Sequence, residues 1–196
     1  IIHLRALDLQ QSVRFSLDSL QTKQDLQGKP LPSWAKYPAG IAWALGEAGL
    51  KVTGLQAIYS SSVPIGSGLS SSAAVEVAFA ATWRALGGWQ VNNLKLAQLC
   101  LRGETGYVGL ICGLMDQFAS ACGVAGHVLI FDTRSLEWST APLPPGTAIV
   151  VADSGVRRSL ANSAYNERHA SCIEAVELLR KYKPGLQSLR DISTVE

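Results

Sequence analysis

Pro64-Ile65-Gly66-Ser67-Gly68-Leu69-Ser70-Ser71-Ser72-Ala73-Ala74 is the stretch that decides how this chain folds. Residues 54–59 before it alternate as a strand does, and Val75, Phe79 and Trp83 after it recur at helical spacing. The pattern predicts a strand, a loop rich in glycine and serine, and a helix. Such a loop is suited to phosphate, because glycines let the backbone approach an anion and a helix start offers free N–H groups. A serine-capped turn is the alternative that composition alone leaves open.

The loop lacks the two best-known nucleotide motifs. A Walker A sequence requires a lysine that this stretch does not contain. The third glycine of a dinucleotide fingerprint is replaced by Ser71. Any phosphate binding here must therefore use a different signature.

Composition indicates a globular protein of 196 residues, with 47% hydrophobic and 16% charged residues. The formal net charge is +2 without a basic run, which argues against a nucleic-acid partner. No stretch reaches the roughly 18 apolar residues that span a membrane, so we expect no membrane partner. The four cysteines form no C-x-x-C pair, which disfavours a metal or redox role and suits a reducing cytoplasm.

Alternating predicted strands and helices give an α/β or α+β protein. The predicted strands are residues 1–17 (one or two strands), 52–63, 128–131 and a buried strand at 148–152. The predicted helices are the segment that follows the serine-rich loop and extends to about residue 86, and residues 38–49, 94–104, 115–122 and 162–182. Glycines at 103, 106, 109 and 113 are expected to break up the section between two helices. The proline-rich loop before residue 147 is the expected boundary, which gives domains at 1–146 and 147–196.

One acidic residue is hard to explain structurally. Asp116 opens a predicted helix, where an aspartate is usually a cap or a solvated acid. Here it follows a glycine-broken segment and lies beside apolar residues, where an acid has little structural reason to be.

The full pattern P-x-x-x-G-L-S-S-S-A-A resembles the second signature motif of the GHMP small-molecule kinases. The run Met115-Asp116-Gln117-Phe118 with residues 126–137 is similar to the galactose-phosphorylating branch of that family. A third block, residues 153–160 followed by 165–168, agrees with it. Together the blocks span roughly residues 34–172 in the family's order.

The resemblance implies a fold and a reaction. The fold would be the two-layer α+β N-terminal domain of GHMP kinases, of the ribosomal-protein-S5-domain-2-like type. It would be incomplete and followed by the start of the C-terminal domain. The reaction would transfer the γ-phosphate of ATP to the C1 hydroxyl of galactose. Two alternatives stay open: a kinase of N-acetylgalactosamine or arabinose, and a sugar sensor without catalysis.

The resemblance also implies roles for particular residues. Asp116 would be the catalytic base, and Glu104 with Ser72, or next Ser71, would hold Mg²⁺. Gly113, Asp116 and Tyr165 would contact the sugar. The ATP site would comprise Trp34 and Tyr37 at the adenine and the loop residues Pro64, Gly66, Ser67, Gly68, Leu69, Ser70, Ser71, Ser72 and Ala73. By themselves, the two aromatic residues could equally be core or loop anchors, and Glu104 could be a surface helix residue.

The chain departs from the family pattern in several places. The usual A-E-N becomes Gly103-Glu104-Thr105, and Y-N-x-R-R ends in His169. The family's first motif, G-R-x-N-x-x-G-E-H-x-D-Y, and its last glycine-rich motif are absent, and Met115 is the only methionine. We therefore expect a piece of a longer chain. Alone, it would be inactive and prone to self-associate through uncovered core.

Overall fold

The computed structural model describes residues 1–155 and 161–192, so residues 156–160 of the third sequence block lie outside the described residues. The chain divides into two compact units, Ile1–Val156 and Arg157–Glu196, which are treated separately below. The expected domain boundary at 146 remains a prediction.

A three-stranded sheet opens the first unit. Strands β1 (Ile2–Ala6) and β2 (Gln11–Phe15) pair antiparallel, and β3 (Leu55–Tyr59) joins β1 in parallel, which gives the order β2-β1-β3. Side chains alternate across the sheet, so that Ile2 and Leu4 are buried on one face while Arg5 is exposed on the other. One face of this sheet therefore forms the floor of the core.

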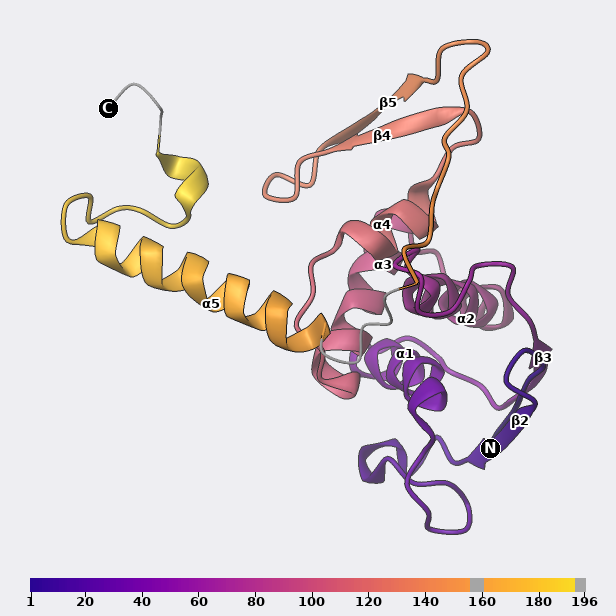
Figure 1. The fold of residues 1–196 in the computed structure, drawn as a ribbon. Coiled ribbons are helices and arrows are strands. Elements are labelled where there is room, and N and C mark those ends of the chain that lie inside the picture. The colour runs from indigo at the N-terminus through magenta and orange to yellow at the C-terminus, as the bar shows by residue number, and fades with distance from the viewer. Residues whose placement is uncertain (156–160, 193–196) are drawn as a thin grey trace. The chain divides into compact units, whose positions relative to one another are not determined.

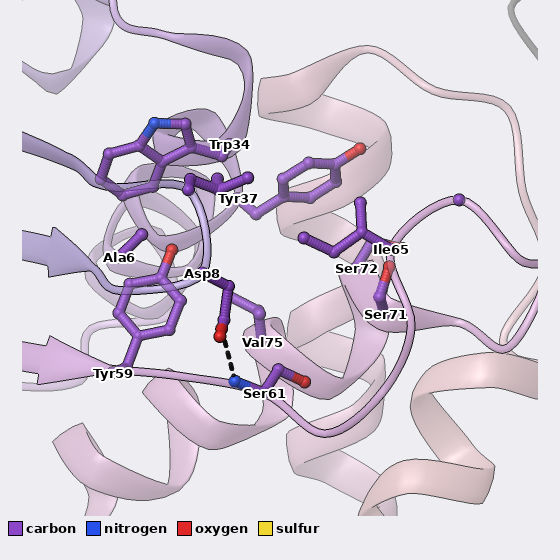
Figure 2. A pocket seen from close by; sticks show the side chains of 12 residues that line it. Ala6, Asp8, Trp34, Tyr37, Tyr59, Ser61, Ile65, Ser71, Ser72 and Val75 are labelled. Carbon is purple, nitrogen blue, oxygen red and sulfur yellow. Dashed lines mark hydrogen bonds between the residues drawn. The ribbon is translucent and has the colours of Figure 1, made fainter.

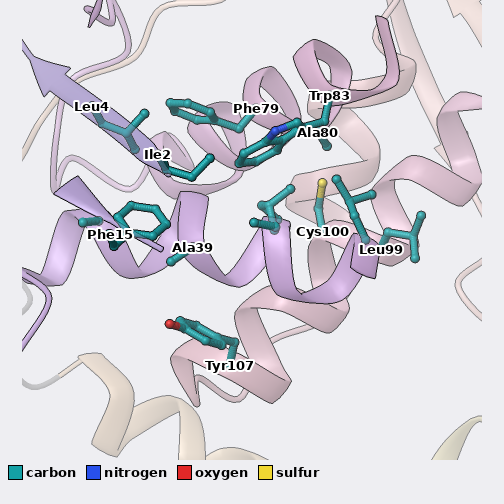
Figure 3. Packing of buried hydrophobic residues seen from close by; sticks show 14 of the residues in the cluster. Ile2, Leu4, Phe15, Ala39, Phe79, Ala80, Trp83, Leu99, Cys100 and Tyr107 are labelled. Atoms are coloured by element: carbon teal, nitrogen blue, oxygen red, sulfur yellow. The ribbon is translucent and has the colours of Figure 1, made fainter. Parts of the chain in front are cut away.

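Helices cover that face. They are α1 (Lys36–Glu47), α2 (Ser71–Gly87) and α3 (Asn93–Arg102), with short 3₁₀ turns at Leu20–Thr22 and Ser33–Ala35, and α4 (Met115–Cys122) packs on α2 and α3 (Figure 1). Sheet residues Ile2, Leu4 and Phe15 pack in one core with α2 residues Phe79 and Trp83 (Figure 3). The result is the expected two-layer α+β arrangement.

A second, smaller core lies where a hairpin meets α4. Strands β4 (His127–Phe131) and β5 (Trp138–Pro142) pair antiparallel, and the Phe131 ring stacks on Phe118 with centroids 3.9 Å apart. Strand β5 is absent from the sequence prediction, because its residues, WSTAP, show no alternation of apolar and polar side chains.

The second unit is built on one long helix. It contains α5 (Ala161–Arg180), as the sequence predicts, and a 3₁₀ turn at Leu189–Asp191 whose start carries a capping box formed by Ser188 and Asp191. Among the described residues of both units, no helix combines the length and the apolarity needed to cross a membrane.

The glycines after α3 break up the section before α4 only from Gly109 on, since residues 109–113 have no regular secondary structure, whereas Gly103 and Gly106 cause no break, contrary to prediction. Helical backbone continues as a π-helix, Gly103–Val108, labelled η3. These glycines instead allow close packing: a Cβ on Gly103 would lie 2.9 Å from the carbonyl oxygen of Gly40 in α1.

The expected buried strand at residues 148–152 is wrong. This segment has no regular secondary structure, and Ile149, Val150 and Val151 are 74%, 88% and 60% exposed. An apolar run indicates suitability for burial, but a strand also needs a neighbouring strand. The described residues provide none beside this segment.

The close approach of α1 and η3 predicts an asymmetry between two glycines of one helix. A Cβ on Gly40 would lie 3.0 Å from the Gly103 oxygen and 3.2 Å from the Tyr107 ring, whereas one on Gly46 would meet nothing within 4 Å. We expect Gly40→Val to lower the free energy of unfolding by about 1–3 kcal/mol through overpacking. Urea unfolding measures this change, and Gly46→Val is the matched control. Equal stability of the two variants would contradict the packing described here.

Candidate functional site

The loop between β3 and α2 presents backbone groups that are not used elsewhere. Gly66 and Gly68 have φ of 74° and 80°, and Ser70, just before the helix, has φ of 59°. No backbone amide from Gly68 to Ser72 donates a hydrogen bond to any described residue. The hydroxyls of Ser70, Ser71 and Ser72 likewise have no hydrogen-bond partner among those residues. These free donors sit at the positive end of the α2 dipole.

A pocket of about 340 Å³ joins this loop to the predicted aromatic pair. Figure 2 shows the Trp34 and Tyr59 rings on one side and Ser71 and Ser72 on the other, with Tyr37 between them. Trp34 comes from the 3₁₀ turn before α1 and Tyr37 from the first turn of α1. The structure thus brings together residues that are about 35 positions apart in the sequence.

Hydrogen bonds and ring contacts hold the pocket walls. The indole Nε1 of Trp34 donates to Gln11 Oε1 at 2.6 Å, and its ring lies 6.1 Å from that of Tyr59. Asp8 Oδ2 accepts from the backbone N–H of Ser61 at 2.7 Å and so fixes the entry to the loop. Burial, and secondarily the charge of Asp8, raise the pKa of Tyr59 to about 12.

Tyr59 and Asp8 were not expected from the sequence. Each comes just after or at the end of a strand that enters the pocket, because β1 and β3 are parallel and end at the same edge. Tyr59 could have been predicted from the sequence, because it ends the strand that comes immediately before the loop. Asp8 could be found only once the pairing of β1 with β3 was known.

A buried polar cluster lies on three elements of the first unit. Glu76 of α2, Glu104 of η3 and Gln117 of α4 are 0%, 6% and 1% exposed. Gln117 Nε2 donates to Glu104 Oε2 at 2.6 Å and to Glu76 Oε2 at 3.1 Å. The thiol of Cys112 also donates to Glu104 Oε2, at 3.1 Å. Glu104 was expected at a site, whereas Glu76 and Gln117 were missed.

The acids of this cluster act electrostatically on Tyr37, which lines the pocket. Burial, and then the charge of Glu104, raise the pKa of Glu76 to about 9. Burial raises the pKa of Tyr37, and the carboxylates of Glu104 and Glu76 raise it further. Burial and the bond to Glu104 raise the pKa of the Cys112 thiol, which is therefore a poor nucleophile. Tyr37 is the residue that links the pocket to the acidic cluster.

Asp116 lies next to this cluster in the first turn of α4 and is half-buried. Its carboxylate has no hydrogen bond or ion pair with any described residue. Gly113, three residues earlier, is exposed, and a Cβ there would meet nothing within 4 Å. A carboxylate without a structural partner beside open space is available to a ligand.

Tyr165, the third predicted sugar contact, is described within its own unit. Tyr165 belongs to the second unit, where it is 48% exposed and its ring lies parallel to that of His169 at 6.5 Å. Its predicted contact with sugar therefore remains a prediction.

The residues present fit a magnesium ion of the kind that accompanies nucleotide phosphates. Both hydrogen bonds to the carboxylate of Glu104 end on Oε2, and Oε1 accepts none from the described residues. Ser72 precedes Glu76 by one helical turn, so both are on the same face of α2. Among the described residues no three His, Cys, Asp or Glu side chains converge on a metal position. Mg²⁺ often uses only one or two protein ligands and completes its shell with phosphate oxygens and water.

Comparisons with known proteins give matches of one kind. Residues 36–124 match the family model described as the GHMP kinases N terminal domain. The galactokinase of Roseiflexus sp. is 40% identical over 98% of this chain and 48% of that protein. The galactokinase of Chloroflexus aggregans is 39% identical over 100% of this chain and 49% of that protein.

A solved structure agrees. The crystal structure of Lactococcus lactis galactokinase complexed with galactose matches 98% of this chain and 49% of that chain, with a TM-score of 0.82 and 27% identity. The chain thus spans about half the length of the galactokinases that it matches.

The raised pKa of Glu76 predicts how stability changes with pH. Between its ordinary value of 4.5 and about 9, the folded state keeps a proton that the unfolded chain has released. Stabilisation that is fully present below pH 4.5 is therefore lost as the pH rises toward 9. Glu76→Gln removes this titration, so its free energy of unfolding should fall less over that range.

Urea unfolding of the chain between about pH 5 and pH 9, with a chelator present, measures this dependence. Glu137→Gln, which alters an exposed acid of the same unit, is the control. A pH dependence of Glu76→Gln equal to that of the unmodified chain would show that Glu76 is ionised in the fold.

Proposed function

We propose that the protein containing this chain is a galactokinase, which transfers the γ-phosphate of ATP to the C1 hydroxyl of galactose. The observation that carries the proposal is the pocket in which Trp34 and Tyr37 face a loop of unbonded amides. The galactokinase relatives and the galactokinase structure with galactose support the choice of substrate.

ATP would occupy the pocket with its adenine against the aromatic side chains and its phosphates along the loop. Rings provide apolar contact area and stacking, and the free amides at the start of α2 suit phosphate oxygens. The proposed phosphate contacts comprise Pro64, Gly66, Ser67, Gly68, Leu69, Ser70, Ser71, Ser72 and Ala73.

Mg²⁺ would be held by Glu104 and Ser72, and it would neutralise charge on the phosphates when bound. Glu104 has one carboxylate oxygen open to such an ion, and the Ser72 hydroxyl has no described partner. The chain's own contribution is to hold these two oxygen ligands in place.

Galactose would lie beside Asp116 and Gly113, with Tyr165 as a further proposed contact. As the C1 oxygen forms a bond to the γ-phosphorus, the bond to the bridging oxygen breaks and ADP leaves. The proton of the C1 hydroxyl passes to the carboxylate of Asp116, which is half-buried and has no partner among the described residues. The open space at Gly113 leaves room for a sugar to approach that carboxylate.

Two further proposals concern the chain itself. Its four cysteines are free thiols, which suits a reducing cytoplasm. The exposed apolar segment Ile149–Val151 would promote self-association of the isolated chain, which light scattering can measure.

The first test replaces the proposed base in the full-length protein that contains this chain. Asp116→Asn keeps the shape of the side chain but cannot accept the proton. We expect kcat to fall by roughly 10²–10⁴, with little change in the KM for galactose. ADP release is measured with Mg·ATP and galactose, N-acetylgalactosamine or arabinose, with Asp18→Asn at an exposed loop as the control.

If the unmodified protein phosphorylates only N-acetylgalactosamine or only arabinose, the proposal transfers to that substrate. If the unmodified protein phosphorylates none of the three sugars, the proposal of a sugar kinase is refuted. An Asn variant with near-normal kcat would exclude Asp116 as the base.

The second test concerns the nucleotide pocket. Adenine that stacks in the pocket should quench the fluorescence of Trp34, one of five tryptophans in the chain. ATP titration of the chain should therefore change its emission, and Trp34→Phe should abolish most of that change. Trp138→Phe is the matched control, because Trp138 packs on Phe118 away from the pocket lining. Equal quenching in Trp34→Phe and the unmodified chain would place the adenine elsewhere.

A further inference from the structure

Gln117 occupies an unusual position between two acids. It is 1% exposed, and its amide nitrogen donates to one oxygen of Glu104 and one of Glu76, at 2.6 Å and 3.1 Å. An amide NH₂ has two hydrogens, so both are used. The three side chains come from α4, η3 and α2, which makes Gln117 the polar link among these elements.

Only one of the two carboxylate oxygens of Glu104 accepts hydrogen bonds from the described residues. Gln117 and Cys112 both donate to Oε2, and no described residue donates to Oε1. Oε1 is also not among the fully buried atoms that lack a partner. A carboxylate fixed through one oxygen has a defined orientation and can still offer the other oxygen to a ligand.

Core stability does not explain this arrangement. Oε1 of Glu76 and Oε1 of Gln117 are buried without any partner, which costs about 1–3 kcal/mol for each group. Apolar side chains of similar volume would avoid that cost. The cluster is therefore better explained by the orientation that it imposes on Glu104.

We propose that Gln117 is a positioning residue, which holds Glu104 by Oε2 so that Oε1 faces the metal–nucleotide, while Glu76 holds the amide of Gln117 in place. This inference rests on the proposed role of Glu104 as a ligand of Mg²⁺. Gln117 itself touches neither the metal nor a substrate in this scheme.

Gln117→Met tests the proposal in the full-length protein, because methionine has a similar length and volume but no N–H donor. Mn²⁺ binding in the presence of ATP is measured by electron paramagnetic resonance, and the Mg²⁺ concentration for half-maximal rate by ADP release. We expect each to rise by roughly 10- to 100-fold, as for other partners of metal ligands. ATP quenching of tryptophan fluorescence without metal should stay near the wild-type value.

Phe118→Leu is the control for a purely structural effect. Phe118 is the buried neighbour of Gln117 on α4 and packs on Phe131, with no hydrogen bond to either acid. It should lower the unfolding midpoint without changing the Mn²⁺ affinity. Unchanged Mn²⁺ affinity in folded Gln117→Met, or an equal loss in Phe118→Leu, would overturn the proposal.

A second pair of variants decides the matter if Gln117→Met does not fold. Cys112→Ala removes the other donor to Glu104 Oε2, whereas Cys112→Ser keeps a hydroxyl donor. Weaker Mn²⁺ binding in the alanine variant that is restored in the serine variant supports positioning through Oε2. Wild-type affinity in both variants overturns it.

The two proposals can fail separately. If the wild-type protein phosphorylates no sugar but Gln117→Met still weakens Mn²⁺·ATP binding, the positioning role stands and the galactokinase proposal fails. If the wild-type protein phosphorylates galactose and folded Gln117→Met binds Mn²⁺ normally, the reverse holds.

Discussion

The backbone contact between Gly40 and Gly103 is the constraint on which the site depends. Neither residue has a Cβ, so α1 and η3 approach until a Cβ on Gly103 would lie 2.9 Å from the Gly40 oxygen. Tyr37 precedes Gly40 by one turn and lines the pocket, and Glu104 follows Gly103 directly. The glycine contact therefore sets the spacing between a wall of the pocket and the acid proposed as a metal ligand. Larger residues would separate the two.

The π-helix adds a second constraint. It continues α3 without a break and ends at Gly109, whose φ of 90° closes the segment. The wider turn changes the angular position of each residue relative to an α-helix, and such segments occur frequently at functional sites. Glu104 thereby lies within the core, 6% exposed, where a hydrogen bond from Gln117 is unscreened by water. The energetic cost of that burial is local and is offset by the surrounding apolar core.

The sequence predicted the elements with strong periodicity or strong motifs, and much of the proposed site. Helix Met115–Cys122, the loop before α2 and the first two strands were confirmed. The π-helix was missed because glycine indicates a break locally, whereas here two helices require its small size. Residues 148–152 were misassigned because apolar character alone does not identify a pairing partner. Roles inferred from the family resemblance, such as that of Asp116, remain predictions.

Glu76 and Gln117 show why part of a site cannot be found from one sequence. Each is a polar residue among the apolar residues on the buried face of its helix. From sequence alone, a single polar residue in a helix is usually explained as facing solvent. Their role in the fold depends on each other and on Glu104. Glu76 lies 41 positions and Glu104 lies 13 positions from Gln117 in the sequence. Burying a polar side chain is energetically unfavourable for each of the three helices taken alone. The cost is reduced only when the three helices are assembled and the amide and the two acids form hydrogen bonds. Local rules therefore fail at the positions where distant elements must orient one group together.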